Sequence, residues 1–136
     1  LYRVMRGGRS LSLAGTSFSE RSDYCPFIES GATAIGWDGR LSPCLPLLRD
    51  HTSYLDDRER FSRCYVVGNI NERSLAEMWN APEYAAFRER VQTFDFSPCT
   101  RCGGCDLSET NAEDCFGNTF PTCGGCLWAQ GVIRCP

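Results

Sequence analysis

CTRCGGC, residues 99–105, places three cysteines two residues apart, with a pair of glycines between the second and the third. The last four letters recur as CGGC at residues 123–126. Cysteines at this spacing are typical of metal ligands, because both thiolates of a tight loop can point at one centre. The sequence therefore predicts that this part of the chain is organised around a metal.

A disulfide scaffold of a secreted protein is the first alternative for these cysteines. The chain has 136 residues, the size of one domain or of two small lobes, and contains 10 cysteines. That is far above ordinary usage and just under the density typical of small disulfide-built scaffolds. The two-residue spacing favours metal ligation over disulfide pairing.

Composition limits the partners that the chain is expected to have. The formal net charge is −3, which argues against binding that relies on attraction to nucleic-acid phosphates. No apolar run approaches the ~20 residues needed to cross a membrane, and nothing resembles a signal peptide. We therefore expect a cytoplasmic protein with no nucleic-acid and no membrane partner. The first residue is Leu1 rather than Met, which suggests a fragment of a longer protein.

The first part of the chain divides into a lead-in and a short hairpin. Residues 1–24 have no periodicity and are expected to form a loop that links to an upstream domain. Within residues 25–44, Thr33, Ile35 and Trp37 alternate with smaller residues before Asp38-Gly39. This pattern predicts a β-hairpin with a type I′ turn at Asp38-Gly39.

The middle of the chain is expected to be mostly irregular. Residues 45–63 are polar and charged and are interpreted as a surface loop, in which His51 is solvated rather than a metal ligand. Tyr65–Val67 is expected to form a short strand, and Gly68-Asn69 a turn.

Two short amphipathic helices are predicted next. Ser74 followed by Glu77 is a capping box, so a helix should start at about residue 74. Pro82 suits the first turn of a second helix. The expected apolar face of the first helix comprises Leu75, Met78 and Trp79, and that of the second comprises Tyr84, Phe87 and Val91. Glu83, Arg88 and Arg90 are expected on the solvent side of the second helix.

The fold class follows from these elements. We expect a small α+β domain with a short hairpin and two short helices, followed by a cysteine-rich, loop-dominated C-terminal region. Seven of the ten cysteines lie within residues 99–135, where neither helical nor strand periodicity is present. Because such a segment buries little apolar surface, metal binding is expected to supply folding energy there.

Cysteine number and spacing favour iron–sulfur clusters over zinc. A zinc ribbon could use Cys99, Cys102, Cys123 and Cys126, but six cysteines would remain. Three cysteines in CxxCxxC form with a remote fourth are typical of [4Fe–4S] ligation, and a Cys-Pro pair often accompanies the remote ligand. Such pairs occur at residues 25–26 and 135–136. Two clusters require about eight thiolates.

The chain resembles the SPASM domain, the auxiliary-cluster domain of radical S-adenosylmethionine (radical SAM) enzymes, from residue 25 to residue 136. The family's Gly-x4-Cys hairpin motif is matched by Gly39 and Cys44. Its GNI-x-E-x-SL-x-E-x-W segment is matched over residues 68–79, and its Tyr/Phe-Arg helix by residues 84–88. The string DCFGNTFPTCGGCLWAQGVIRCP, residues 114–136, looks most like maturases of tungsten oxidoreductases and related maturases.

The resemblance implies two auxiliary [4Fe–4S] clusters. One would take Cys25, Cys44 and a cysteine that returns from the C-terminal region, and the other would be built on Cys99 and Cys102. The tail differs from the family's Cys-x2-Cys-x5-Cys-x3-Cys, because the gaps here are x2, x2, x9, x7, x2 and x8. We therefore rank the candidate metal ligands: first Cys25, Cys44, Cys99, Cys102, Cys115 and Cys126, then Cys105, Cys123 and Cys135, and last Cys64, which could be structural only.

The radical-generating motif CxxxCxxC is not in this sequence. S-adenosylmethionine is therefore expected only in a radical SAM barrel upstream or on another chain, so no catalytic residue is assigned here. The expected function is electron transfer and substrate positioning in a maturase. Its expected partners are that barrel, a peptide or protein substrate, and a reductant of the ferredoxin or flavodoxin type. The alternative is a structural zinc module for protein contacts.

Overall fold

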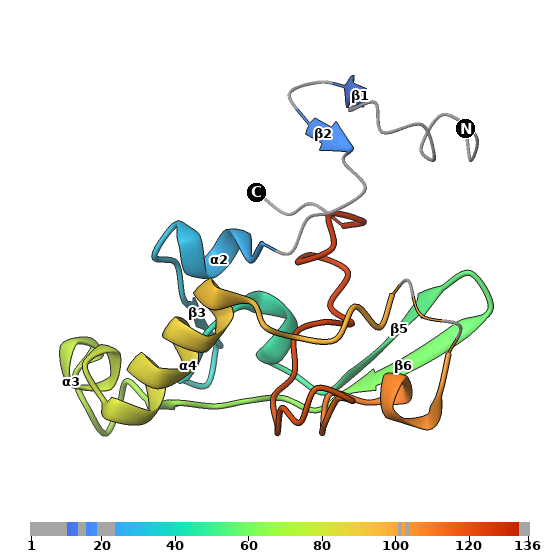
Figure 1. The fold of residues 1–136 in the computed structure, drawn as a ribbon. Coiled ribbons are helices and arrows are strands. Elements are labelled where there is room, and N and C mark those ends of the chain that lie inside the picture. Colours follow the sequence, from blue (N-terminus) through green and yellow to red (C-terminus); the bar gives the residue numbers. More distant parts are fainter. Residues whose placement is uncertain (1–10, 14–15, 19–23, 101, 103, 134–136) are drawn as a thin grey trace.

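The computed structural model describes residues 11–13, 16–18, 24–100, 102 and 104–133, and it has short antiparallel strands and short helices (Figure 1). The described strands form three small sheets with the orders β1-β2, β3-β4-β7 and β5-β6. The predicted small α+β class is confirmed.

The first pair of strands lies where only loop was expected. β1 (Leu11–Leu13) pairs antiparallel with β2 (Thr16–Phe18), with Leu11 opposite Phe18. In the sequence, Leu-Ser-Leu and Thr-Ser-Phe flank an Ala-Gly pair, and a glycine-containing pair between two short segments is compatible with a hairpin turn. The expectation of a loop was therefore wrong for these six residues, and most of the remaining lead-in lies outside the described residues.

The predicted hairpin is confirmed, but its turn differs. β3 (Ala34–Ile35) pairs with β4 (Arg40–Ser42), and a short helix, α2 (Pro26–Glu29), precedes them. The Gly36 carbonyl accepts from the Gly39 N–H at 2.9 Å, so Trp37 and Asp38 are the central residues of the turn. Of Asp38 and Gly39, only Gly39 has a positive φ, of 83°, whereas a type I′ turn centred on this pair would require a positive φ at both residues.

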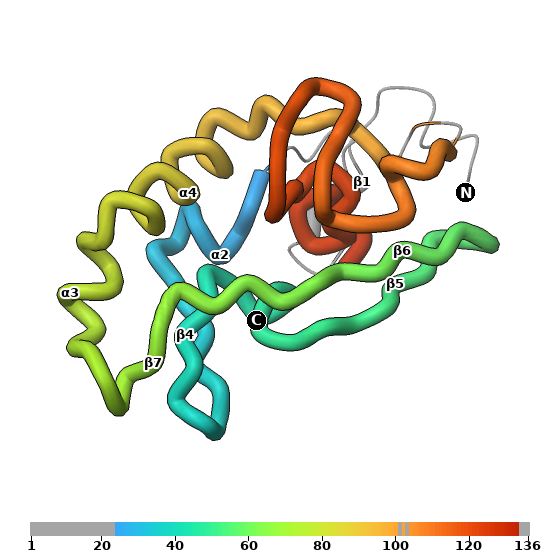
Figure 2. Tube along the Cα trace, turned by 90° about the horizontal axis from the view of Figure 1, so that it is seen from below, coloured from blue at the N-terminus to red at the C-terminus, as the bar shows by residue number. Residues whose placement is uncertain are grey.

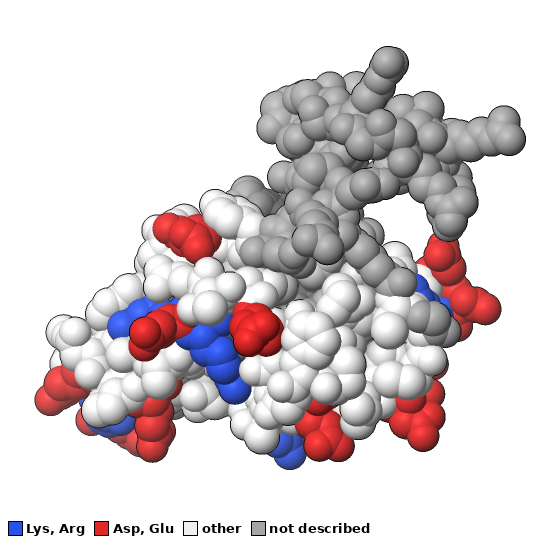
Figure 3. All heavy atoms as spheres, viewed as in Figure 1, with Lys and Arg blue, Asp and Glu red and all other residues white. Residues whose placement is uncertain are grey.

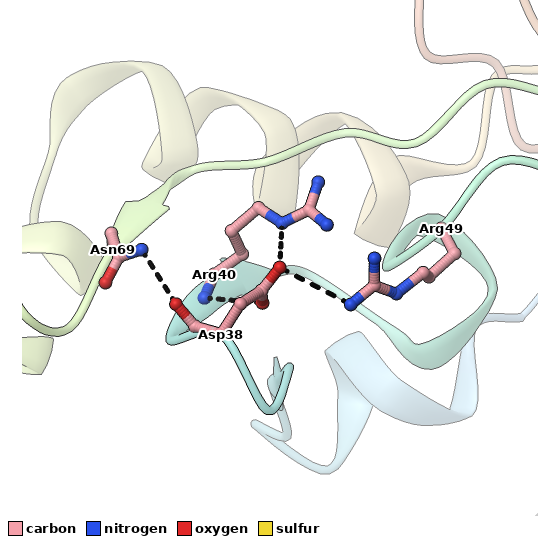
Figure 4. A network of polar contacts seen from close by, with 4 residues as sticks. All are labelled: Asp38, Arg40, Arg49 and Asn69. Carbon is pink, nitrogen blue, oxygen red and sulfur yellow. Dashed lines mark hydrogen bonds and ion pairs between the residues drawn. The ribbon is translucent and has the colours of Figure 1, made fainter.

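Polar contacts hold the tip of this hairpin against its neighbours (Figure 4). The Asp38 carboxylate accepts from Arg40 at 2.7 Å and from Arg49 at 3.4 Å. The Asn69 side chain donates to the Asp38 carbonyl at 3.1 Å. Asn69 belongs to β7 (Gly68–Asn69), the third strand of this sheet, so the network ties the turn to both flanking segments.

A second hairpin replaces the surface loop expected over residues 45–63. After the 3-10 helix η1 (Leu45–Leu47), β5 (His51–Leu55) pairs with β6 (Arg58–Ser62) along its whole length. Asp56-Asp57 forms the two-residue connection, with Asp56 at φ 55°. The segment has the period of two that strands require, but its half-buried positions include polar residues, so composition concealed the pattern.

The strand expected at Tyr65–Val67 lies slightly further along the chain. Gly68-Asn69, expected to be a turn, pairs with β4 instead, while the Val67 N–H donates to the Leu41 carbonyl at 2.8 Å. A Cβ atom at Gly68 would lie 2.6 Å from the Met78 sulfur. Only glycine therefore lets this strand lie so close to the following helix.

The two predicted helices and their starts are confirmed. α3 (Leu75–Trp79) begins after Ser74, whose hydroxyl accepts from the Glu77 N–H, while the Glu77 carboxylate accepts from the Ser74 N–H. α4 (Pro82–Thr93) begins at the predicted proline. Its predicted apolar stripe is buried: Tyr84, Phe87 and Val91 are all at most 5% exposed.

Two details of the helix faces were wrong. Leu75, predicted on the apolar face of α3, is 46% exposed. Arg88 and Arg90, expected on the solvent side of α4, are half-buried against aromatic rings. The Arg88 guanidinium lies 4.0 Å from the centroid of the Trp79 ring. Arginine can cover an aromatic face while its charge remains near water, which periodicity does not reveal.

The segment that follows α4 lies between α4 and the β5-β6 hairpin, as Figures 1 and 2 show from two directions. Its only regular element among the described residues is the 3-10 helix η2 (Asp106–Glu109). The main apolar core lies where α4 meets α2 and η1, and comprises Ile28, Cys44, Leu47, Tyr84, Phe87, Val91 and Phe96.

Acidic and arginine side chains are interspersed on the face drawn in Figure 3. Among the described residues, no helix combines the length and the apolar character that crossing a membrane requires.

Candidate metal centre

Four cysteines from three segments of the chain lie close together. Cys44 is buried, which raises its pKa well above the usual range, and the charges of Cys126, Cys123 and Cys25 would raise it further. Cys25 and Cys123 also pack against the core cluster that contains Cys44. We call Cys25, Cys44, Cys123 and Cys126 the hairpin-side set, because the first two flank the β3-β4 hairpin.

Helical turns follow the cysteines of this set. Cys25 immediately precedes α2 and Cys44 precedes η1, each with a proline in the first two helical positions. Burial raises the pKa of Cys25, and the N–H groups of Ile28 and Phe27 oppose that rise. The N–H groups of Ala129 and Trp128 act in the same way on Cys126. Such backbone dipoles favour a thiolate, the form that binds metal.

A second group of cysteines centres on Ser97. The Cys115 thiol donates to the Ser97 hydroxyl at 3.0 Å. Burial raises the pKa of Cys99, while the same hydroxyl lowers it and the charge of Cys115 would raise it. Cys102 and Cys105 are exposed on the loop that follows Cys99. We call Cys99, Cys102, Cys105 and Cys115 the loop-side set, because Cys99 and Cys115 contact Ser97 and the other two belong to the same CxxCxxC run as Cys99.

Side chains from β6 fix the loop that carries this set. Arg58 donates to the Cys102 carbonyl at 2.5 Å and to the Thr100 carbonyl at 2.8 Å. Arg60, two residues on and therefore on the same face of the strand, donates to the Ser108 carbonyl at 2.7 Å. The unexpected second hairpin thus positions the cysteine-rich loop.

Arg60 lies between the two sets of cysteines. Burial lowers its pKa, while the neighbouring thiols of Cys99, Cys126 and Cys123 act in the opposite direction. Its side chain lines one small cavity together with Cys99 and another together with Cys126. Sequence analysis missed this residue, and the alternation of Arg58, Arg60 and Ser62 along a strand was the signal that could have found it.

Both glycines of CGGC at residues 123–126 lie in close contact with neighbouring groups. A Cβ atom at Gly124 would overlap the Ser97 carbonyl oxygen, and one at Gly125 would overlap the Arg60 guanidinium. The loop therefore lies against Arg60 and against Ser97, the residue that contacts Cys99 and Cys115 of the loop-side set. The cysteine spacing of this loop is typical of metal ligands, whereas its two glycines allow close contacts with Ser97 and Arg60.

The remaining predicted site residues lie apart from these sets or outside the described residues. The Cys64 N–H donates to the Asp50 carboxylate at 2.7 Å. Burial raises the pKa of the Cys64 thiol, and the hydrogen bond and negative charge of Asp50 raise it further. His51, interpreted from the sequence as solvated rather than as a metal ligand, contacts the Arg49 carbonyl and the edge of the Trp128 ring, and it lines the cavity that Arg60 and Cys126 share. Cys135 lies outside the described residues. Over the described ranges, no three His, Cys, Asp or Glu side chains converge to hold a single metal ion.

The donor chemistry of the two sets fits a thiolate-bound centre. All eight members carry soft sulfur donors, and the nine cysteines within the described residues are free thiols. Backbone N–H groups approach the hairpin-side sulfurs, which is the outer shell that thiolate-bound clusters use. The fold and these thiols define a small thiolate-based metal-binding domain.

Comparison with known proteins identifies its family. The model of SPASM, an iron–sulfur cluster-binding domain, matches residues 25–106. The chain belongs to this family, which confirms the resemblance found in the sequence. It is also 32% identical, over 139 aligned positions, to the tungsten-containing aldehyde ferredoxin oxidoreductase cofactor-modifying protein of Pyrococcus furiosus. That alignment covers all of this chain and 38% of the relative. No solved structure matches the chain.

Proposed function

We propose that this chain is the auxiliary domain of a radical SAM maturase and holds two [4Fe–4S] clusters for electron transfer and substrate positioning. Iron–sulfur binding follows from the family. Two clusters are supported by two groups of thiols near Arg60, one of Cys25, Cys44, Cys123 and Cys126 and the other of Cys99 and Cys115, which the CxxCxxC run extends with Cys102 and Cys105. Each set contains four cysteines, the usual number for one [4Fe–4S] cluster.

Each set would hold one cluster with thiolates from different parts of the chain. The hairpin-side cluster would be held by Cys25, Cys44, Cys123 and Cys126. The loop-side cluster would be held by Cys99, Cys102, Cys105 and Cys115. When bound, the clusters supply one-electron redox chemistry. The chain itself contributes sulfur ligands, of which Cys44 and Cys99 are buried, and backbone N–H groups that favour the thiolate form of Cys25 and Cys126.

The parent enzyme would supply the radical chemistry. Because CxxxCxxC is not in this sequence, we place S-adenosylmethionine in a separate barrel domain, joined through residues 1–24 to the cluster domain of residues 25–136. The relative from Pyrococcus furiosus is named for modifying the cofactor of an oxidoreductase. We propose a protein substrate of that kind, or a peptide, together with a ferredoxin or flavodoxin-type reductant in the cytoplasm.

Metal analysis of the anaerobically reconstituted chain tests the cluster assignment. We expect about eight irons and eight inorganic sulfides per chain, and a loss of about four of each in Cys44→Ser and in Cys115→Ser. Cys64→Ser is the matched control, because Cys64 contacts Asp50 rather than another thiol set, and it should keep its full iron content. Saturation at four irons, or zinc bound in preference to iron, would contradict the proposal.

The fourth ligand of the loop-side cluster can be tested separately. Cys105→Ser should lower the iron content by about one cluster, because Cys105 completes the CxxCxxC run, whereas Cys135→Ser should keep both clusters. The opposite result would assign Cys135 to the site and release Cys105.

The division of labour with the barrel domain gives a further test. With dithionite and S-adenosylmethionine, the clusters of the reconstituted chain should be reduced, but no 5′-deoxyadenosine should accumulate above a control without protein. Turnover of S-adenosylmethionine by this chain would make one of the two sets the catalytic site and overturn the auxiliary assignment.

A further inference from the structure

Arg60 is a buried cation without an acidic partner among the described residues. Its side chain is buried, with 8% of the residue exposed, yet both ion pairs found in the described part of the chain belong to Asp38 instead. The hydrogen bonds of its guanidinium go to neutral groups, the Ser108 carbonyl at 2.7 Å and the Thr122 hydroxyl at 3.4 Å.

A buried guanidinium in such surroundings needs a counter-charge. Moving an isolated charge out of water is expensive, and neutral hydrogen bonds compensate only part of that cost. The ionisable groups next to Arg60 are the thiols of Cys99, Cys123 and Cys126. As thiols they carry no charge, but as thiolates around a cluster they would supply the missing negative charge from both sets.

The surroundings of Arg60 fix its guanidinium in this position. Gly125 leaves room for it, because a Cβ atom there would lie 2.6 Å from the nearer terminal nitrogen. Arg60 and Cys99 line a cavity of ≈ 30 Å³, and Arg60 and Cys126 line another of ≈ 20 Å³. In the β5-β6 ladder, Ser53 lies opposite Arg60. The charge therefore sits in one well-defined place between the sets.

We infer that Arg60 is the shared counter-cation of the two clusters and raises the reduction potential of both. This inference rests on the two-cluster proposal above. Reduction adds one electron, and hence one negative charge, to a cluster. A fixed positive charge in a poorly solvated site stabilises that more negative state, so reduction becomes more favourable. Arg60 acts on the clusters through its charge and takes no covalent part.

A redox titration of the reconstituted full chain, followed by electron paramagnetic resonance, tests this role. In Arg60→Gln, the equilibrium constant for reducing each cluster should fall at least tenfold, which is about 59 mV for a one-electron couple. Arg60→Lys keeps the charge and should retain most of the wild-type potential. Arg63→Gln is the matched control, because the same charge is lost from an exposed guanidinium over the Phe120 ring.

A second variant tests the position of the charge without removing it. Gly125 does not have a positive φ, so Gly125→Ala suits the backbone, while its Cβ would displace the Arg60 guanidinium from its present position. Gly125→Ala should shift both potentials in the same direction as Arg60→Gln, by a smaller factor. If Arg60→Gln fails to retain its clusters, Gly125→Ala decides the question, and unchanged potentials there would overturn the inference.

Other outcomes separate this inference from the proposed function. Wild-type protein that binds zinc, or only one cluster, would refute the two-cluster proposal itself. Wild-type protein with two clusters whose potentials do not change in Arg60→Gln, or change equally in Arg63→Gln, would refute only the role of Arg60. A shift confined to one cluster would show that the cation is not shared.

Discussion

The region around α4 and the region after it are stabilised by different kinds of side chain. Apolar residues dominate the buried positions of residues 24–96, where Tyr84, Phe87 and Val91 pack against Ile28 and Leu47. Beyond residue 96 the buried side chains are largely polar and comprise Ser97, Asn111, Asp114, Thr122 and Gln130, with Leu127 and Ala129 as the main apolar members. Within its described residues, the C-terminal region therefore has no apolar core of comparable size.

Long polar side chains compensate for part of this difference. Arg58 and Arg60 of β6 donate to carbonyls in the loop of residues 99–108, and Arg90 of α4 donates to the Thr119 and Pro121 carbonyls. Asn111 exchanges two hydrogen bonds with the backbone of Arg63. The first region thus supports the second, and the clusters would provide the remaining stability by linking segments that share few apolar contacts.

Removal of the metal should give the largest difference between the two regions. Chelation should increase amide hydrogen exchange throughout residues 97–133, because thiolate ligation connects that region to the rest of the chain. Exchange in α4 should rise much less, since its buried stripe packs without metal. Hydrogen exchange with mass-spectrometric readout measures both at once, and equal protection with and without metal would show that polar contacts alone suffice.

A cavity in the apolar core should have the next largest effect. Phe87 is 5% exposed and packs against Tyr65, so Phe87→Ala should reduce the free energy of unfolding by about 3–5 kcal/mol. Phe116→Ala is the control in the C-terminal region, because Phe116 is 59% exposed and should cost less than about 0.5 kcal/mol. Urea denaturation of both variants measures the difference. Similar costs would contradict the contrast between the regions.

The same contrast explains what the sequence could predict. Periodicity and capping located α3 and α4 because an apolar face and a Ser-Glu box act locally. The Gly-Asn pair was misassigned because its pairing with β4 is a tertiary contact, whereas the turn preference of Gly and Asn is a local property. The β5-β6 hairpin was missed since it faces a polar region instead of an apolar core, so its inward side chains are hydrophilic.

Cysteine spacing predicted that a metal site exists, but it did not predict which cysteines lie together. The resemblance implied that Cys25 and Cys44 share a cysteine from the C-terminal region, and the structure places both Cys123 and Cys126 beside them. Spacing alone would pair Cys123 and Cys126 with Cys99 and Cys102, as in a zinc ribbon. Arg60 and Ser97, which lie between the thiols, belong to no cysteine motif, and only the tertiary fold reveals them.

Asp114 tests the polar support of the C-terminal region. Burial alone would raise the pKa of this carboxyl, but the N–H groups of Ser97, Asn118 and Phe116 lower it. Asp114→Asn should therefore cost about 2 kcal/mol near pH 7, because a charge-assisted acceptor is lost from a site 6% exposed. Urea unfolding of the reconstituted chain, with the iron content of the variant checked against that of wild type, measures this cost.

The pH dependence of that cost identifies the carboxylate as its source. A group whose pKa is lower in the folded state stabilises the fold above its unfolded-state pKa, about 3.9 for Asp, and loses this effect as the pH falls through the folded-state value. The difference between wild type and Asp114→Asn should therefore be constant from pH 7 to about pH 4 and shrink only below that. A difference that already declines near pH 6 would assign the effect to another group.

The cap of α3 should give the smallest effect and confine it to the first region. Ser74→Ala removes the hydroxyl that accepts from the Glu77 N–H at 3.3 Å, which should lower the free energy of unfolding by about 1 kcal/mol. Glu77→Gln is the matched variant, because glutamine can still accept from the Ser74 N–H in a capping box, and it should cost less. Hydrogen exchange should increase within residues 75–79 in Ser74→Ala while residues 97–133 keep their protection. Since α3 contacts the rest of the chain chiefly through Met78 and Trp79, increased exchange in the C-terminal region would mean that the two regions unfold together, and the division between them would have to be abandoned.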